Sequence, residues 1–546
     1  MKENGRTMNE MVNLRLVITL CCFAIVGVRH DAVAQSVPDL ARARQVSQHG
    51  VTWKFDREVP VGQFVNGDFY VVGPVTVVEI DPAPVDGMNG SVLNLNPRRG
   101  KSGFDSRASR GNSYDAGMRS APPIAMKPGD SLLSSVSAEK ERQFPQMLWP
   151  FQPEKGMARC WVRSVSVLTC MDGAQPADAF RPAFCDLENR IFLARNLRRD
   201  LLPKLKPVEG TPSPAEFAKH FQRCWVDVMR QNKGAPAEYA AQYGRETSRA
   251  GGMATLILMC DFPDEEKEKL LVNIVQYGID LYGTLEAGWA GWETLGGHGQ
   301  GRKWPIVFAG IMFGSEAMAR PDRTFPRIVF QEDDQTVYGK GWTGATALFA
   351  GHIGRSGWDL YPDQDSRGFF AEPVHPSEWP DDGKGSKFSN PGKTAEAYRR
   401  CCTSHAWIAT ALSIRIMHAE ATWNHDAFGD YCDRWMTEDD SEHVKILTEH
   451  AGLIIDAAKR QGRTWDPWVD ATYKQYRKAL PPARTIDFVS PDPYPARAPA
   501  AQSDGTLDRQ RRRSERPGDR PSRERRRSDR PDKRPTRDEE SRRSDR

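Results

Sequence analysis

Between Asp172 and Pro182 the spacing of apolar residues along this 546-residue chain changes from two to three and four. Before this segment, Val51, Trp53 and Phe55 alternate with polar neighbours, which is the period of a half-buried β-strand. After it, apolar residues recur with the spacing of one face of an α-helix. Strands and helices are thus segregated along the chain, and we predict an α+β protein with an all-β domain followed by an all-α domain.

The β domain is predicted over residues 50–171. Asn66-Gly67-Asp68 separates two runs of strand-forming residues and predicts a tight hairpin turn. We expect the strands of this domain to form a small β-sandwich. Further strands are predicted at 75–80, 131–137 and 160–169.

The helical domain is predicted over residues 183–482, where apolar faces repeat at helical spacing. Segment 398–420 is apolar nearly all round, so we expect a buried helix there. A proline-rich insertion at 359–392 interrupts the pattern. Helices joined by loops of differing length are typical of antiparallel hairpins, as in an α/α toroid or an irregular bundle. The remaining helical faces lie at 217–228, 271–282, 304–312, 426–436 and 444–458.

The first 34 residues have the pattern of a secretory signal peptide. The apolar run Leu14–Val28 follows basic residues and precedes Ala32-Val33-Ala34, a small-x-small cleavage signature. The alternative is an uncleaved anchor, but the run is shorter than the roughly 20 residues that a spanning helix needs. We therefore predict cleavage after Ala34, no transmembrane segment in the mature chain, and a periplasmic or extracellular location.

The C-terminal segment 503–546 is predicted to be a disordered tail. It contains 17 Arg or Lys and 11 Asp or Glu, a net charge of +6, and almost no apolar residues. Alternating signs cancel much of the field that would attract phosphates, and export also argues against a nucleic-acid partner. Contact with the cell envelope is an open role for the tail.

The cysteines after the signal match no zinc-binding spacing, so we expect buried thiols for most of them. An oxidising compartment nevertheless permits disulfides. The candidate pairs are Cys160 with Cys170, and Cys401 or Cys402 with Cys432.

The segment Thr294–Pro305, T-L-G-G-H-G-Q-G-R-K-W-P, has the composition of a binding site. Its glycines permit positive φ and close approach of another molecule. Aromatic faces, an imidazole, an amide and two cations within a short segment are typical of a carbohydrate site, which we predict here. The residues concerned are Trp289, Trp292, His298, Gln300, Arg302 and Lys303.

These features, with the sequence W-N-H-D-A-F-G-D-Y-C-D-R-W-M at Trp423–Met436, resemble secreted bacterial α/α-toroid carbohydrate-active proteins. That broad group includes alginate and heparinoid lyases. The resemblance implies cleavage of an acidic, uronate-containing polysaccharide by β-elimination. Asn424 and His425, at the expected start of a helix, are further candidate substrate contacts at the mouth of the helical domain.

A lyase needs a group that neutralises the uronate carboxylate, a base, and an acid for the leaving oxygen. Arg302 and Lys303 are the candidates for the carboxylate. His298 is the candidate base, because its ordinary pKa near ~6.5 lets it accept a proton at neutral pH. Tyr243 or Tyr338 is the candidate acid. Each of these residues also has an ordinary structural interpretation, as a loop histidine or a core or rim tyrosine.

A glycoside hydrolase is the alternative enzyme, and it requires two carboxylates roughly 5 to 9.5 Å apart. Glu332-Asp333-Asp334 is the best source, because this acidic run lies between two apolar segments. Its structural interpretation is a solvated turn or the start of a helix. A third possibility is a non-catalytic envelope or glycan-binding protein.

No metal or other cofactor is expected. His405 and His418 are spaced so that they do not share one helical face, and His425 follows Asn424 at a likely helix start. No H-E-x-x-H or comparable ligand set occurs in the sequence.

Overall fold

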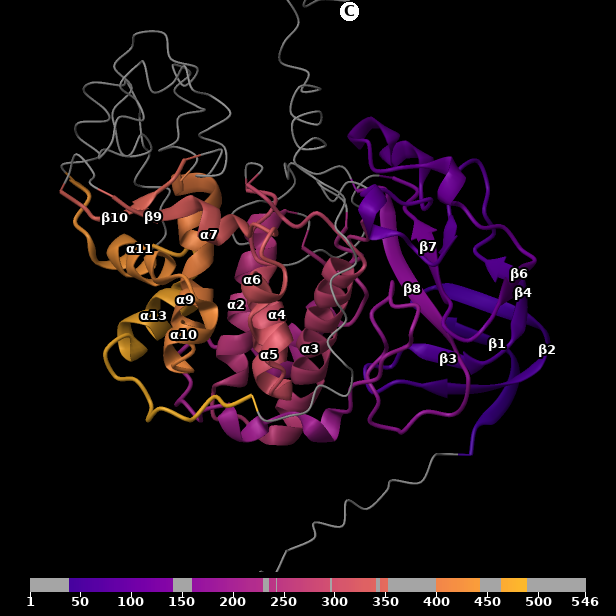
Figure 1. Ribbon diagram of the computed structural model, residues 1–546, viewed down its shortest axis with the longest axis horizontal. Helices are drawn as coiled ribbons and strands as arrows, with labels where there is room; N and C mark the ends of the chain where they lie inside the picture. The colour runs from indigo at the N-terminus through magenta and orange to yellow at the C-terminus, as the bar shows by residue number, and fades with distance from the viewer. Residues whose placement is uncertain are drawn as a thin grey trace, which may run out of the picture.

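The computed structural model describes residues 39–140, 160–228, 235–241, 243–294, 297–339, 344–351, 399–441 and 463–488. Within these ranges a β-rich domain lies beside a helical domain, which confirms the α+β organisation (Figure 1). Four predicted features lie outside the described residues: the signal peptide, the insertion at 359–392, the helix at 444–458 and the tail.

The strands of the β domain belong to one sheet with the order β5-β7-β8-β3-β2-β4-β6, and β1 pairs with β2 beside this path. Neighbouring strands are antiparallel except for β3 and β8, which run parallel. The strands are β1 (Ala41–Gln48), β2 (Val51–Gln63), β3 (Phe69–Val72), β4 (Val75–Asp81), β5 (Ser91–Leu93), β6 (Ile124–Met126), β7 (Ser131–Ser137) and β8 (Val162–Met171).

The predicted sandwich of separate sheets is therefore corrected to a single curled sheet. The long strand β2 explains the difference, because its two ends have different partners. Its first residues pair with β4, whereas Val61–Gln63 pair with β3 across the predicted Asn66-Gly67-Asp68 turn. Register shifts at Lys54/Phe55 and at Ala43/Gln45 bend the ladder, as β-bulges do.

Strand β8 is buried on both faces, although its sequence reads as half-polar. Leu168 belongs to the core inside the curled sheet, while Val165 and Val167 pack on the outer face against residues that lead into the helical domain. The intervening Ser164 and Ser166 remain buried because their hydroxyls donate to the carbonyls of His49 (2.9 Å) and Gln48 (2.8 Å).

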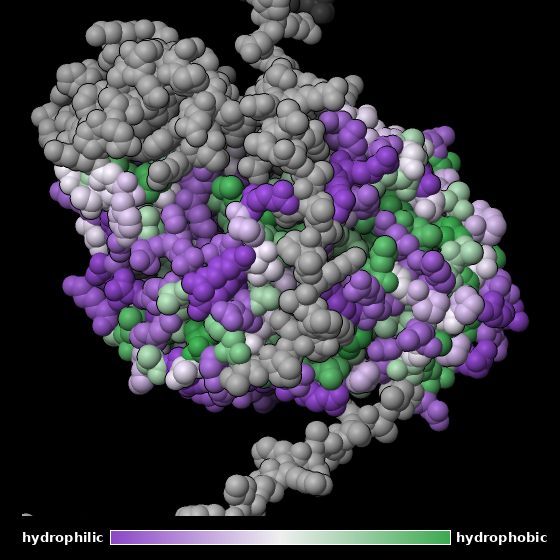
Figure 2. Space-filling model, viewed as in Figure 1, coloured by the Kyte–Doolittle hydropathy of each residue, from purple (hydrophilic) through white to green (hydrophobic). Residues whose placement is uncertain are grey.

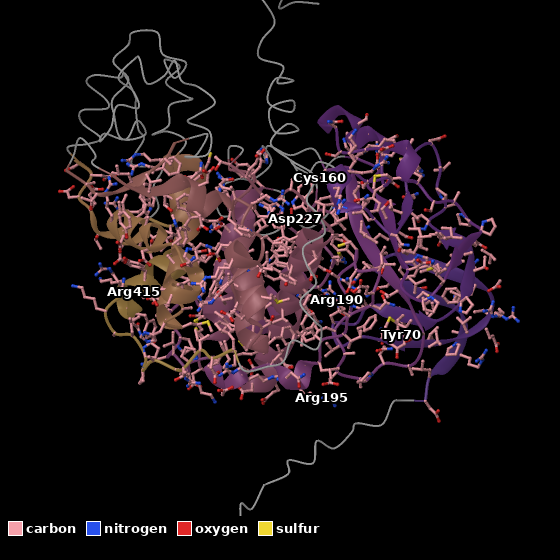
Figure 3. The ribbon with its side chains drawn as sticks, viewed as in Figure 1. Tyr70, Cys160, Arg190, Arg195, Asp227 and Arg415 are labelled. Carbon is pink, nitrogen blue, oxygen red and sulfur yellow. The ribbon has the colours of Figure 1, made fainter. Side chains whose placement is uncertain are left out.

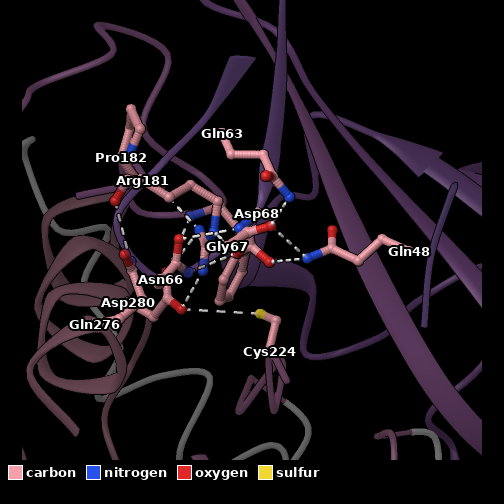
Figure 4. Close-up of polar contacts among 11 residues, drawn as sticks. Gln48, Gln63, Asn66, Gly67, Asp68, Arg181, Pro182, Cys224, Gln276 and Asp280 are labelled. Carbon is pink, nitrogen blue, oxygen red and sulfur yellow. Dashed lines mark hydrogen bonds and ion pairs between the residues drawn. The ribbon is translucent and has the colours of Figure 1, made fainter. Parts of the chain in front are cut away.

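A buried ion cluster also joins the two domains (Figure 4). Arg181, only 1% exposed, donates from Nε to Asp68 Oδ2 at 2.5 Å and from Nη2 to Asp280 Oδ2 at 2.6 Å. Asp68 lies in the β2–β3 turn and Asp280 in helix α3. Burial raises the pKa of Asp280, and Arg181 opposes that shift. The guanidinium of Arg181 thus forms ion pairs with both the β domain and the helical domain.

The long helices pack closely where glycine removes a side chain. A Cβ on Gly252 of α2 would lie 2.5 Å from the backbone nitrogen of Thr410 in α9, so these helices touch through their backbones. Helices α3, α4, α9 and α11 confirm predicted helices. The helices are α1 (Pro214–Ala218), α2 (Gly244–Leu258), α3 (Asp264–Glu286), α4 (Lys303–Phe313), α5 (Glu316–Ala319), α6 (Pro321–Thr324), α7 (Gln331–Gln335), α9 (Ser404–Ile416), α10 (Glu420–Trp423), α11 (Asp426–Thr437) and α13 (Pro467–Tyr476).

Two local predictions in the helical domain are corrected. The apolar face at 217–228 is helical only through α1 and a short 3-10 turn ending at Phe221, and Val226 then adopts a positive φ of 47°. The domain also contains a small two-stranded sheet, β9 (Thr336–Tyr338) with β10 (Ala347–Phe349), where the sequence predicts no strand.

The expectation of buried thiols is confirmed for Cys160, Cys170, Cys185, Cys224, Cys260 and Cys432, which are buried and form no disulfide. A Cys160–Cys170 disulfide and a disulfide to Cys432 are therefore excluded in this structure. Cys402 is disulfide-bonded.

The described helices include none that combines the length and apolar character needed to cross a membrane. On the face seen in Figure 2, hydrophobic side chains are scattered among hydrophilic ones. Large exposed hydrophobic residues such as Val78 and Leu187 occur singly.

Candidate functional site

The amide groups of the glycine loop, residues 297–302, are bound by side chains of the helical domain. Helix α7 supplies two of the acceptors, at consecutive residues, and the residue before helix α2 supplies a third. The bonds run from the Gly297 amide to Tyr243 Oη (2.8 Å), from the Gly299 amide to Gln331 Oε1 (2.7 Å), and from the Gly301 amide to Glu332 Oε1.

The glycines make room for protein atoms, whereas the sequence predicts that they clear space for a ligand. A Cβ on Gly297 would lie 2.2 Å from the Tyr243 hydroxyl oxygen. One on Gly301, where φ is +91°, would lie 2.3 Å from the backbone nitrogen of Ser248. The loop is therefore packed into the helical domain.

Arg302 is bound to protein groups through its whole guanidinium. Its Nε and Nη2 donate to the two oxygens of Asp227 at 2.7 and 3.0 Å, and its Nη1 donates to the carbonyls of His298 and Gln300. Asp227, seen between the two domains in Figure 3, also accepts from the Tyr277 hydroxyl at 2.8 Å. With 1% exposure, Arg302 closes the loop and is not placed to meet a substrate carboxylate.

Lys303 is equally internal, with no exposed surface. Its Nζ donates to Asp333 Oδ2 at 2.6 Å and to the carbonyl of Trp423 at 2.7 Å. It also lies 4.0 Å from the centre of the Trp423 ring, a cation–π contact. The second predicted carboxylate-binding cation is thus paired within the fold.

The predicted sugar-binding side chains Trp289, Trp292 and Gln300 are core residues, exposed by 5%, 6% and 0%. The Trp292 ring stacks on Phe330, and its Nε1 donates to the carbonyl of Asp227 at 3.2 Å. Gln300 Nε2 donates to the carbonyl of Cys402 at 2.6 Å. The faces of both tryptophans are therefore covered by protein.

Tyr243 and His298, predicted separately as acid and base, lie in contact. Their ring centres are 4.6 Å apart with the planes at 87°, and His298 is half-buried. Burial raises the pKa of Tyr243 to about 12, while Arg245 and the Gly297 amide oppose the shift. Within the described part of the chain, the Tyr243 hydroxyl accepts the Gly297 bond and has no acceptor for its own proton. We refer to these two residues as the Tyr243–His298 pair.

Two groups beside this pair have no part in the sequence predictions. The Arg245 guanidinium lies 5.4 Å from the ring centre of Tyr243 and 5.5 Å from that of Trp465, and it donates to Glu246. Trp465 has a positive φ of 60°, unusual for a bulky residue, and stacks on His405 at 4.0 Å. Arg245 follows Tyr243 by two positions in Q-Y-G-R, so proximity in sequence was an available signal for it; Trp465 had none.

Glu332 and Asp333 of α7 are ordered against the glycine loop. Glu332 is 2% exposed, and its Oε2 has no hydrogen-bond partner among the described residues. Burial raises the pKa of Glu332 to about 7, while the Gly301 amide opposes the shift. Asp333 pairs with Lys303, and Asp334 accepts from the Thr294 hydroxyl at 2.6 Å. Glu332 and Asp334 are buried and Asp333 is half-buried. The acidic run forms the first turn of α7, so the helix-start interpretation is confirmed and the solvated turn is not.

Three further candidates have partners away from the Tyr243–His298 pair. Tyr338 is 56% exposed and donates to Asp430 at 2.6 Å, a bond that raises its pKa to about 12. Asn424 donates to Asp322 at 2.6 Å. His425 Nε2 lies 3.0 Å from the Thr336 hydroxyl and joins α11 to β9.

Comparisons of the chain with protein-family models, with curated proteins and with solved structures find no match. Among the residues that the structure describes, no three His, Cys, Asp or Glu side chains are grouped so as to hold a metal ion. Function is therefore inferred from the geometry around the Tyr243–His298 pair.

Proposed function

We propose that this protein is a polysaccharide lyase that cleaves a uronate-containing glycan by β-elimination, with the Tyr243–His298 pair as its acid and base. The observation that carries the proposal is the edge-on contact of the two rings at 4.6 Å. His298 is half-buried, and Tyr243 has a hydroxyl proton that no described residue accepts. An imidazole base and a phenol acid held together are what an elimination needs.

In the proposed reaction His298 removes the proton on the carbon next to the uronate carboxylate. The electron pair forms a carbon–carbon double bond as the glycosidic carbon–oxygen bond breaks. Tyr243 gives its proton to the leaving oxygen. Because burial raises the Tyr243 pKa to about 12, this phenol remains protonated, and therefore able to donate, at neutral pH.

We assign Arg245, in place of Arg302, to the substrate carboxylate. The guanidinium of Arg302 is already bound by Asp227 and two loop carbonyls. Arg245 is also buried, with 2% exposure, but it lies directly beside the Tyr243 ring, and the carboxylate that it binds, Glu246, is its neighbour in sequence. A uronate at this position would compete with Glu246 for that guanidinium.

The test is incubation with a panel of uronate polysaccharides while the absorbance of unsaturated product and the formation of reducing ends are both followed. We expect both signals from the wild-type protein, and a loss of at least about 100-fold in kcat for Tyr243→Phe and for His298→Ala. Tyr338→Phe is the matched control and should retain activity, because its hydroxyl is bound to Asp430 at an exposed position. Unchanged activity in both site variants would refute the assignment.

A glycoside hydrolase is the second candidate, favoured by the buried Glu332 with its pKa near 7 beside Asp333. It would produce reducing ends without the absorbance. Binding of a glycan with neither signal would identify a non-catalytic envelope or glycan-binding protein.

The wider architecture belongs to the same proposal. We infer that the chain is exported to the periplasm or the cell exterior after removal of residues 1–34, and that the helical domain is organised as an α/α toroid. In support, the signal-like pattern precedes Gln35, and the long helices pack in pairs, α2 with α9 and α3 with α4. An acidic polysaccharide is the proposed partner, with the Arg-rich tail as an envelope contact.

A further inference from the structure

Helix α7 connects a buried carboxyl group to the loop that carries His298. Gln331 and Glu332 each accept a hydrogen bond from a loop amide, at Gly299 and Gly301 respectively. His298 lies between Gly297 and Gly299, both of which have a bound amide. The Glu332 carboxyl group is therefore connected to His298 by one hydrogen bond and the backbone between Gly301 and His298.

The surroundings of Glu332 are poorly suited to a negative charge. Only its Oε1 has a hydrogen-bond donor among the described residues, and its Oε2 is buried. An ionised carboxylate with one buried oxygen left without a donor is unfavourable unless water or another donor reaches it. The protonated acid can remain buried at lower cost.

We propose that Glu332 is a positioning residue, which holds the glycine loop and His298 against Tyr243 while it is protonated and releases the loop when it ionises. Only the catalytic consequence rests on the proposed lyase function. The loop movement itself is a property of the fold and requires no substrate.

Within the described ranges, the charged and titratable groups that face Glu332 lie on the glycine loop, on α7 itself and on α11. Arg302 of the loop favours its ionised form, and Asp333 on the same helix disfavours it. Cys432 of α11 is buried. Burial raises the pKa of its thiol most, and the nearby carboxyl groups of Asp433 and Glu332 raise it further. Beyond Glu332, Thr336 donates to its carbonyl and contacts His425. Burial outweighs these effects and raises the pKa of Glu332 from 4.5 to about 7.

The direction of the pH effect follows from linkage. A released loop exposes the carboxyl group to water, so its pKa falls towards 4.5 and a proton is lost. Below about pH 4.5 the carboxyl group is protonated in both states, so the closed loop has its maximum stability there. Its opening constant rises by up to about tenfold per pH unit as the pH approaches 7, and it levels off above that value.

The experiment is hydrogen exchange of the amides of residues 297–302, measured from pH 5 to pH 8 and corrected for intrinsic exchange. We expect wild-type protection to fall by about one to two orders of magnitude across this range and then to level off. Glu332→Gln retains an acceptor for the Gly301 amide without a charge, so protection should be high and independent of pH. Glu332→Ala leaves that amide without its acceptor, so protection should be low at every pH.

Glu420→Gln is the matched control, because it removes one carboxylate from an exposed position of α10 and should behave as wild type. An equal fall of protection in wild type and in Glu332→Gln would overturn the proposal, as would pH-independent protection in wild type. If Glu332→Ala does not fold, the comparison of wild type with Glu332→Gln still decides.

Catalysis gives a separate readout. If the protein is a lyase, Glu332→Gln should keep more of its kcat/KM at pH 8 relative to pH 6 than wild type does. Absence of lyase activity together with the expected exchange profile would refute the function and leave the role of Glu332 intact. Activity with a pH-independent loop would refute the role of Glu332 alone.

Discussion

At the scale of single residues, the buried charges of this protein are matched one to another. Arg302 with Asp227 and Lys303 with Asp333 bring together residues far apart in sequence. Each guanidinium or ammonium group is almost fully buried, so its partner carries most of the compensation for lost hydration. Removing one member of such a pair should therefore lower the free energy of unfolding by more than the pair itself contributes to it.

We expect Arg302→Ala to lower the free energy of unfolding by about 3–5 kcal/mol, because the Asp227 carboxylate would remain buried with the Tyr277 hydroxyl as its one hydrogen-bond donor among the described residues. Arg195→Ala is the control, since Arg195 is 42% exposed in its side chain and lies 3.6 Å from Asp178. Arg195 is labelled just below the helices in Figure 3, and its substitution should cost no more than about 1 kcal/mol. Urea unfolding measures both, and equal losses would contradict the burial argument.

At the scale of elements, the distance between paired helices is set by glycines, which have no side chain at the contact. Gly252 of α2 touches the backbone of α9, and Gly278 of α3 lies against the carbonyl of Pro305 in α4, where a Cβ would be 2.4 Å away. These contacts set how closely the long helices approach. A methyl group at either position has no space unless the helices separate.

Gly252→Ala should therefore destabilise the protein by about 1–3 kcal/mol, because the added Cβ would meet backbone atoms of Ala409 and Thr410 at 2.8 and 2.5 Å. Gly429→Ala in α11 is the matched control, since nothing lies within 4 Å of its Cβ position. That change should stabilise the protein by about 0.5–1 kcal/mol through helix propensity alone. Thermal unfolding of the two variants should shift in opposite directions, and shifts of the same sign would refute the close-packing explanation.

At the scale of the whole molecule, Arg181 ties the curled sheet to the helices. In Arg181→Ala, Asp68 and Asp280 would be left buried without their cation. Burial already raises the pKa of Asp280, and loss of the opposing Arg181 would raise it further. Carboxyl groups with a raised folded pKa bind more protons in the folded state, and stability then falls as pH rises. We expect a loss of about 3–5 kcal/mol at pH 8 and a smaller loss at pH 5.

Denaturant unfolding at the two pH values tests this prediction. Asp280→Asn added to Arg181→Ala should recover part of the loss at pH 8, because it removes one of the two uncompensated charges. A loss that is the same at both pH values, and that Asp280→Asn does not reduce, would show that Arg181 contributes only packing.

The local pattern of the sequence determined the type of the longer strands and of helices α3, α4, α9 and α11. Alternation at Val51, Trp53 and Phe55 marked strand β2, and helical spacing marked α3 and α4. These periods depend only on which side chains are buried, so they can be recognised in the sequence without knowledge of the tertiary structure. The same reasoning placed Tyr243 and His298 as candidates, because phenol and imidazole are the residue types that the chemistry needs.

Only the tertiary structure decided which surfaces those elements cover. The sheet curls instead of splitting because β2 changes partners along its length, and that pairing is not encoded in its alternation. The sequence predicts Arg302 as a substrate-binding cation because it gives no sign of a partner for it. The partner, Asp227, lies in a segment that the sequence predicts as an ordinary helix. Local periodicity states that a side chain prefers to be buried or exposed, whereas long-range contacts determine which partner makes the burial of a charge favourable.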